Sequence, residues 1–138
     1  MNSKIQLINK SLLDSTTAQA KTHVRLRMNY NIHSDLNDPV NRMLNALEPG
    51  TVIPIHRHLH PYKNESFVIL RGELDVLLYD DNGQIERRIT LNPEKGNYGM
   101  DIPGEVWHSL EVKQAGTMIY EVKHGPFAPI AEEDLILG

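Results

Sequence analysis

The sequence feature that most constrains the fold is a run of histidines at alternate positions. His56, His58 and His60 lie between Pro54 and Pro61. Proline removes a backbone donor and clashes with the preceding helical turn, so it disfavours a helix here. On an extended strand, alternate side chains leave the same face, with neighbours about 6 to 7 Å apart at the backbone. The run therefore predicts a strand that presents imidazoles on one face.

Size and composition narrow the class of protein. The chain has 138 residues, the size of one ordinary domain, so we expect a single domain over 1–138. A formal net charge of −4 gives no reason to expect a nucleic-acid partner. The absence of cysteine excludes disulfides, thiolate ligands and a cysteine nucleophile. The N-terminal stretch lacks the unbroken apolar run of a signal peptide or membrane span, which predicts a cytoplasmic protein with no membrane partner.

Most of the chain has the pattern of an all-β protein. Ser11 to Asp14 resembles a helix capping box and predicts a short helix through about Lys21, within an N-terminal extension of residues 1–23. From residue 24 onward, short alternating or apolar runs are separated by turn residues, which predicts a β-barrel over 24–124 and a tail over 125–138. We expect strands at about 24–32, 42–47, 51–58, 66–71, 73–79, 85–91, 98–102, 107–113 and 117–123.

Two further residues extend the histidine run into a set of metal donors. Glu65 follows the run, and His108 comes much later, directly after Trp107. Neutral imidazole combined with carboxylate oxygen suits divalent Zn, Fe, Ni or Mn, and the ligand types alone do not choose among these metals. A histidine run is also compatible with a polar strand face, but the added glutamate and distant histidine favour a divalent metal site.

The spacing of these residues resembles the first motif of the cupin superfamily. Five residues separate Gly50 from His56, one separates His56 from His58, and six separate Glu65 from Gly72, as in that motif. The gap before Glu65 is two residues longer than the family pattern. The resemblance implies an all-β cupin-type jelly-roll barrel with a metal at its centre.

The second cupin motif is matched in part. The distance from Pro103 to His108 agrees with the family pattern, whereas Gly104 sits one place early and Val112 stands at the asparagine position. More closely, the segments 42–50, 54–58 and 101–108 resemble the WbuC-type cupin fold metalloproteins, which occur in polysaccharide gene clusters. That resemblance implies a sugar-derived small-molecule substrate in surface polysaccharide synthesis, and cupins in general suggest a homodimer.

Two registers of the histidine run are open. The spacing from Gly50 selects His56 and His58, whereas the usual cupin gap to Glu65 selects His58 and His60. On a straight strand His56 and His60 would lie about 13 Å apart, too far to share one ion. We predict metal ligation by His56, His58, Glu65 and His108, with His60 at the rim of the pocket.

Other residues are candidates for substrate contacts or catalysis. Arg25, Arg27 and Asn29 have the spacing of one strand face and could bind an anionic group, although a solvated strand face shows the same pattern. Arg71 and Trp107 are further candidates for substrate binding. A metal ligand cannot also serve as the proton-transfer base, for which His60, Tyr62 and Tyr98 are candidates, and Glu121 is a spare carboxylate on a late strand.

Three functional classes follow. A metal-dependent isomerase, epimerase or oxygenase would use the metal as a Lewis acid or template. A metal-stabilised domain that binds or senses a small molecule without catalysis is the alternative, because fold alone does not fix function. A metal-free sugar epimerase of related shape would leave the alternating histidines unexplained.

Overall fold

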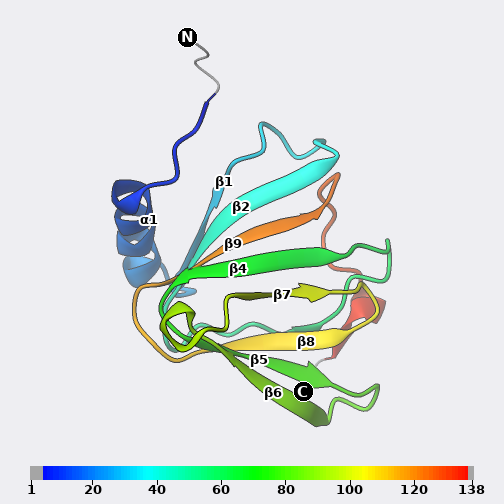
Figure 1. The fold of residues 1–138 in the computed structure, drawn as a ribbon. Coiled ribbons are helices and arrows are strands. Elements are labelled where there is room, and N and C mark those ends of the chain that lie inside the picture. The colour runs from blue at the N-terminus through cyan, green and yellow to red at the C-terminus, as the bar shows by residue number, and fades with distance from the viewer. Residues whose placement is uncertain (1–4, 137–138) are drawn as a thin grey trace.

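The computed structural model describes residues 5–136 and shows two five-stranded antiparallel sheets that face each other (Figure 1). The first sheet has the order β1-β2-β9-β4-β7 and the second the order β10-β3-β8-β5-β6. The strands of the first sheet are β1 (Arg27–Asn31), β2 (Val40–Leu47), β9 (Thr117–His124), β4 (Glu65–Arg71) and β7 (Gly99–Ile102). Those of the second are β10 (Leu135–Ile136), β3 (Ile55–His56), β8 (Trp107–Val112), β5 (Leu74–Tyr79) and β6 (Ile85–Leu91).

The predicted all-β architecture is confirmed, with two differences in the second sheet. The strand expected over 51–58 was too long, because only Ile55 and His56 pair with neighbouring strands. Pro54 has no N–H to donate to a ladder, and the backbone N–H groups of Arg57 and His58 donate to the carbonyls of Asp134 and Gly104, which lie outside the strands. The two-residue strand β10, in the tail, was not predicted.

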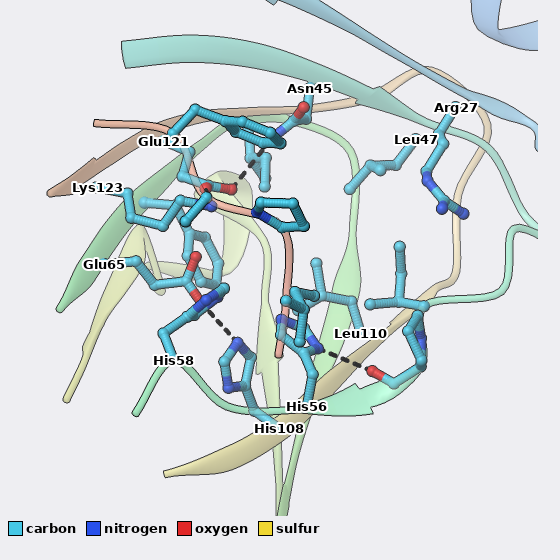
Figure 2. A pocket seen from close by; sticks show the side chains of 18 residues that line it. Arg27, Asn45, Leu47, His56, His58, Glu65, His108, Leu110, Glu121 and Lys123 are labelled. Carbon is cyan, nitrogen blue, oxygen red and sulfur yellow. Dashed lines mark hydrogen bonds and ion pairs between the residues drawn. The ribbon is translucent and has the colours of Figure 1, made fainter. Parts of the chain in front are cut away.

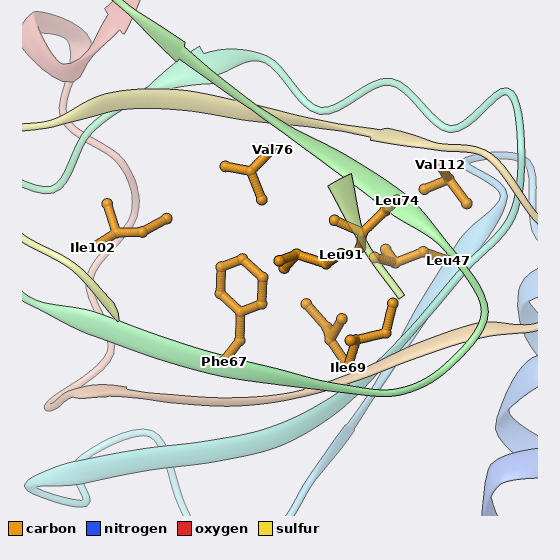
Figure 3. Close-up of a cluster of buried hydrophobic side chains, with 9 residues drawn as sticks. Leu47, Phe67, Ile69, Leu74, Val76, Leu91, Ile102 and Val112 are labelled. Carbon is orange, nitrogen blue, oxygen red and sulfur yellow. The ribbon is translucent and has the colours of Figure 1, made fainter. Parts of the chain in front are cut away.

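The hydrophobic core fills one part of the space between the sheets (Figure 3). Along β4 the period-two alternation is complete: Glu65, Phe67 and Ile69 are buried, and the residues between them are exposed. Burying a large apolar side chain contributes about 1.5–3 kcal/mol, so this cluster supplies much of the driving force for folding. The core cluster consists of Leu47, Phe67, Ile69, Leu74, Val76, Leu91, Ile102, Val112 and Ile119.

The side chains that point between the sheets become polar toward one end of the first sheet. Asn45 of β2 is paired with the apolar Ile119 of β9, and four residues further along, Asn41 is paired with the charged Lys123. On the other side of β9, Lys123 pairs with Glu65 of β4. The same strands that supply the core therefore supply polar side chains where the core ends.

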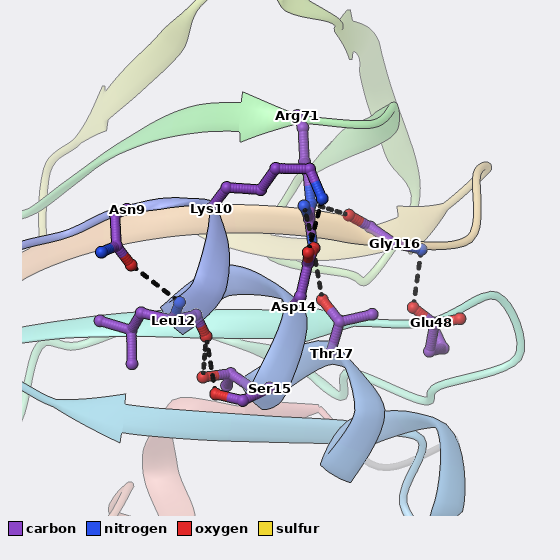
Figure 4. Close-up of polar contacts among 10 residues, drawn as sticks. Asn9, Lys10, Leu12, Asp14, Ser15, Thr17, Glu48, Arg71 and Gly116 are labelled. Atoms are coloured by element: carbon purple, nitrogen blue, oxygen red, sulfur yellow. Dashed lines mark hydrogen bonds and ion pairs between the residues drawn. The ribbon is translucent and has the colours of Figure 1, made fainter.

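Helix α1 (Lys10–Thr22) packs on the outer face of the first sheet (Figures 1 and 4). Its N-cap is Asn9, whose side chain accepts from the backbone N–H of Leu12 at 3.0 Å, so the start predicted at Ser11 was two residues late. Leu12 and Leu13 pack against a buried cluster on β2 and β9. The short 3₁₀ helices η1 (Pro93–Lys95) and η2 (Glu132–Asp134) complete the secondary structure. Within residues 5–136, no helix combines the length and apolar character needed to cross a membrane.

Candidate metal centre

Three imidazoles and one carboxylate converge between the two sheets (Figure 2). His56 and His108 come from the paired strands β3 and β8 of the second sheet, and His58 follows β3. Glu65 begins β4 in the first sheet. One ligand atom from each of these four residues lies within 4.8 Å of those from the other three. The residues predicted as metal ligands are thus brought together by the fold.

The loop after His58 decides which histidines join this group. Asp134 accepts hydrogen bonds from the backbone N–H groups of Leu59 and His60, at 3.0 and 2.7 Å. Its other carboxylate oxygen lies 2.9 Å from the Nδ1 atom of His60. The chain therefore turns away after His58, and the loop accommodates the two extra residues before Glu65. The geometry corresponds to the His56 and His58 register.

Two of the imidazoles are oriented by backbone carbonyls. The Nδ1 atom of His56 lies 2.8 Å from the carbonyl oxygen of Pro54, and that of His108 lies 3.0 Å from the carbonyl oxygen of Val106. A carbonyl oxygen can only accept, so each Nδ1 carries the hydrogen and Nε2 keeps the lone pair in the neutral ring. Metal-binding histidines are commonly fixed in this way by a second hydrogen bond.

The Nε2 atoms of His108 and His58 lie close to the carboxylate of Glu65. Glu65 Oε1 lies 2.6 Å from Nε2 of His108 and 3.5 Å from Nε2 of His58. A nitrogen lone pair and a carboxylate oxygen at such a distance repel unless a proton or a metal ion lies between them. The donor types, their orientation and their convergence fit a divalent transition-metal ion.

Burial and neighbouring charges set the protonation of the group. Burial, with the nearby His108, lowers the pKa of His56 to about 4, so this ring is neutral at pH 7. Burial opposes charge on Glu65 as well, but hydrogen bonds from His108 and His58 outweigh it and hold the pKa of the carboxyl well below its usual range. For His108, burial is outweighed by the hydrogen bond to Glu65, and the pKa is raised. A neutral imidazole and an ionised carboxylate are the forms that bind a metal.

The four residues line a cavity of about 380 Å³. Apolar side chains such as Phe67 and Leu110 form part of its wall, and the C-terminal segment 127–130 forms another part. Glu121 also lines it, where its carboxylate accepts from Asn45 Nδ2 at 3.1 Å and lies 3.5 Å from Lys123 Nζ. Burial, reinforced by the charge of Glu65, raises the pKa of Glu121 to about 7. The cavity thus holds a second carboxyl group beside the candidate ligands.

Three of the predicted substrate-binding residues line a neighbouring cavity, and two do not. Arg25, Arg27 and Asn29 line a second cavity of about 450 Å³, and Arg27 also lines the first. Arg71 lines neither, because its guanidinium binds Asp14 and Thr17 of α1 and the carbonyl of Gly116 (Figure 4). Trp107 also lies outside both cavities: its indole N–H donates to Asp81, and Arg57 stacks 4.3 Å from its ring centre.

The three residues considered as catalytic bases lie outside both cavities. His60, expected at the pocket rim, instead contacts Asp134. Tyr62 and Tyr98 are 49% and 63% exposed and line neither space. The sequence had not singled out Asn45, Lys123 and the segment 127–130 as cavity residues. Their positions on strands 42–47 and 117–123 gave an alternation that could have placed the first two inward.

One family model matches residues 8–91, and its description is "Domain of unknown function (DUF6016)". The chain belongs to the DUF6016 family. The matched range includes His56, His58 and Glu65 and ends before His108. No curated protein sequence matches this DUF6016 member significantly.

Several solved structures share the fold of this DUF6016 member at low sequence identity. KdgF from Halomonas sp. is 12% identical with a TM-score of 0.58, over 75% of this chain and 82% of that one. The cupin domain of Schizosaccharomyces pombe Cnp3 is 11% identical with a TM-score of 0.52, over 71% and 64%. Bacillus subtilis oxalate decarboxylase, which has Mn(II) centres, is 16% identical with a TM-score of 0.55, and the match covers 74% of this chain but only 26% of the enzyme. The likeness confirms the predicted cupin-type jelly-roll barrel and leaves the function to be argued from the site.

Proposed function

We propose that this protein is a cupin metalloprotein that binds one divalent metal ion through His56, His58, Glu65 and His108. The observation that carries the proposal is the convergence of these donors, with the rings of His56 and His108 held by backbone carbonyls and the Nε2 of His108 beside Glu65. A structural role alone would not require three imidazole nitrogens and a buried carboxylate to meet at one point.

We propose further that the centre serves a metal-dependent enzyme. When bound, the metal ion would act as a Lewis acid or as a template for a chelating ligand. Glu121 supports catalysis because it places a second carboxyl group in the cavity, outside the proposed ligand set. Asn45 and Lys123 hold that carboxylate by contacts at 3.1 and 3.5 Å, which orients it for proton transfer.

The resemblance to WbuC-type cupin metalloproteins supports a sugar-derived substrate in surface polysaccharide synthesis, with isomerisation, epimerisation or oxygenation as the reaction. The alternative is a metal-stabilised domain that binds or senses a small molecule without catalysis. One observation favours that alternative: His60, Tyr62 and Tyr98, the bases that the sequence suggested, lie outside both cavities. Substitution Glu121→Gln separates the two, since it should abolish turnover in an enzyme and leave binding intact in a sensor.

The metal proposal is tested by elemental analysis of protein purified without added metal and without a histidine tag. We expect close to one equivalent of divalent metal in the wild type. His58→Ala should lose it, whereas His60→Ala should keep it, because His60 lies next in the alternating run but faces Asp134. A metal-free wild type, or full occupancy in both variants, would refute the ligand assignment.

A homodimer is also part of the proposal, by resemblance to cupins, as are the single domain expected from the length and the cytoplasmic location expected from the N-terminal sequence. Edge strands of open sheets need covering, and β6, β7 and β1 lie at sheet edges. Sedimentation velocity over a hundredfold concentration range is the measurement. A monomer at every concentration would contradict the homodimer.

A further inference from the structure

The cavity at the candidate metal centre adjoins a second cavity. Arg27, Asn45, Lys123 and Phe127 line both spaces. The strands explain why the cavities adjoin, because β1, β2 and β9 are hydrogen-bonded neighbours. A ligand that contacts both cavities would lie along the four shared residues.

The second cavity has cationic side chains and, among the described residues, no carboxylate. Arg25, Arg27 and Lys123 line it, whereas the first cavity has Glu65 and Glu121 beside Arg27 and Lys123. The Nη1 atom of Arg27 donates to two neutral groups, the hydroxyl of Thr51 at 3.2 Å and the carbonyl of Val52 at 2.9 Å. In a concave and partly desolvated space, clustered cations of this kind attract an anion.

Lys123 is paired with one carboxylate. Its side chain is 18% exposed, and its Nζ lies 3.5 Å from Glu121 Oε2. That carboxylate also accepts from Asn45, so it is shared. Arg27 and Lys123 lie on the wall common to both cavities. They are therefore placed to bind an anionic group that lies beyond the metal centre.

Side-chain amides supply the remaining polar surface of the second cavity. Asn29 and Asn45 pair across β1 and β2, and Asn31 and Asn41 lie on the same two strands. Asn41 is 1% exposed, and its Oδ1 is a buried acceptor without a partner among the described residues. Amide groups both donate and accept, which matches the hydroxyl groups of a polyol.

We propose that the ligand is an elongated, polyhydroxylated anion, with one end at the metal centre and a carboxylate or phosphate beside Arg25, Arg27 and Lys123. The metal end of this assignment rests on the proposed function, whereas the anionic end rests on the second cavity alone. Arg25, Arg27 and Lys123 attract the anionic group, and the amides of the second cavity offer hydrogen-bond partners to its hydroxyl groups.

The test is isothermal titration calorimetry of metal-loaded protein with glucuronate, glucose-6-phosphate and uncharged glucose. At least one anion should bind about tenfold or more tightly than glucose, and the preference should weaken at high salt. Arg25→Gln and Arg27→Gln should each weaken anion binding about tenfold without loss of metal. Arg25→Gln is the cleaner variant, since Arg27 also binds the 51–52 segment.

Arg87→Gln is the matched control, because Arg87 is exposed on β6 and lines neither cavity. A preference for glucuronate identifies a carboxylate and a preference for the phosphate identifies a phosphate, and either supports the proposal. Equal or undetectable binding of all three compounds, or Arg25→Gln behaving like Arg87→Gln, overturns it.

A metal-free wild type would refute the proposed function separately. The comparison of anions with glucose would still show whether the second cavity binds an anionic group. Affinity that falls on chelation shows that the ligand reaches the centre, and unchanged affinity refutes the elongated placement.

Discussion

Glu65 Oε1 lies 2.6 Å from His108 Nε2, although the two residues belong to opposite sheets. Their side chains are 6% and 4% exposed. Removing a carboxylate from water costs several kcal/mol unless a partner compensates its charge. In the metal-free protein His108 is therefore the main group that stabilises the buried charge of Glu65, with His58 further away at 3.5 Å.

This relationship predicts strong coupling between the two residues in the presence of a chelator. His108→Ala should destabilise the metal-free protein by about 3 kcal/mol, because it leaves the carboxylate of Glu65 buried and unpaired. Adding Glu65→Gln removes that charge, so the double variant should be no less stable than His108→Ala alone. Urea denaturation of the wild type, both single variants and the double variant measures the coupling. Simple addition of the two single costs would show that the pair is not coupled.

A second prediction concerns the pH dependence of the stability that Asp134 contributes. Its carboxylate accepts from Arg57 Nε at 3.1 Å and from the backbone N–H groups of Leu59 and His60, and it is 1% exposed. Burial raises its pKa, but the hydrogen bonds from His60 and Arg57 outweigh this, and the pKa lies below the ordinary value of 3.8. A folded pKa below the unfolded one gives stability that is present above the unfolded pKa and is lost as pH falls through the folded pKa.

Asp134→Asn should therefore cost about 2 kcal/mol near neutral pH, because it weakens charge-assisted hydrogen bonds to the loop that positions His58. The difference from the wild type should begin to shrink as pH falls below about 4, where the unfolded carboxyl takes up a proton, and it should vanish below the lowered pKa of the folded protein. Urea unfolding from about pH 7 to about pH 3 measures this. A difference that stays constant over the range would contradict an ionised Asp134 as its source.

The fold was predictable because its strands have a clear period-two pattern. Phe67 and Ile69 are buried while Val68 and Leu70 are exposed, and this local alternation fixes both strand and face. Local alternation also allowed His56 and His58 to be proposed as metal ligands, because they are two residues apart in the chain. His108 is brought to His56 by the pairing of β3 with β8, and Glu65 faces them from the opposite sheet; only the family resemblance suggested this arrangement.

The roles of other residues could not be predicted, because they depend on contacts with residues far away in the sequence. His60 contacts Asp134, which is 74 residues away, and does not join the cluster that contains His56. Arg71 was interpreted as a substrate contact, but it binds Asp14 of α1, 57 residues away. No local pattern identifies either partner. Glu121 is intermediate, because its inward position follows from the alternation of β9 once Ile119 is known to be in the core.

Gly72, the last glycine of the first cupin-like motif, provides a third prediction. It has a φ of +91°, and a Cβ built there would lie 2.3 Å from Thr117 Oγ1 and 2.6 Å from Thr117 Cα. Gly96 is the matched control, with a φ of +86° and no atom within 4 Å of a built Cβ. Both alanine variants bear the strain of left-handed backbone, about 1–2 kcal/mol. Gly72→Ala must also displace the backbone at the start of β9, which adds about 1–3 kcal/mol.

We therefore expect Gly96→Ala to lower the free energy of unfolding by about 1 kcal/mol and Gly72→Ala by about 3 kcal/mol or more, both measured by urea denaturation. Thr117 begins β9, whereas Lys123, which pairs with Glu65, lies near the other end of the strand. Folded Gly72→Ala should consequently retain the metal content of the wild type, so the motif glycine acts on packing and not on ligation. Equal costs at the two glycines would show that backbone strain, and not the contact with Thr117, fixes glycine at this position.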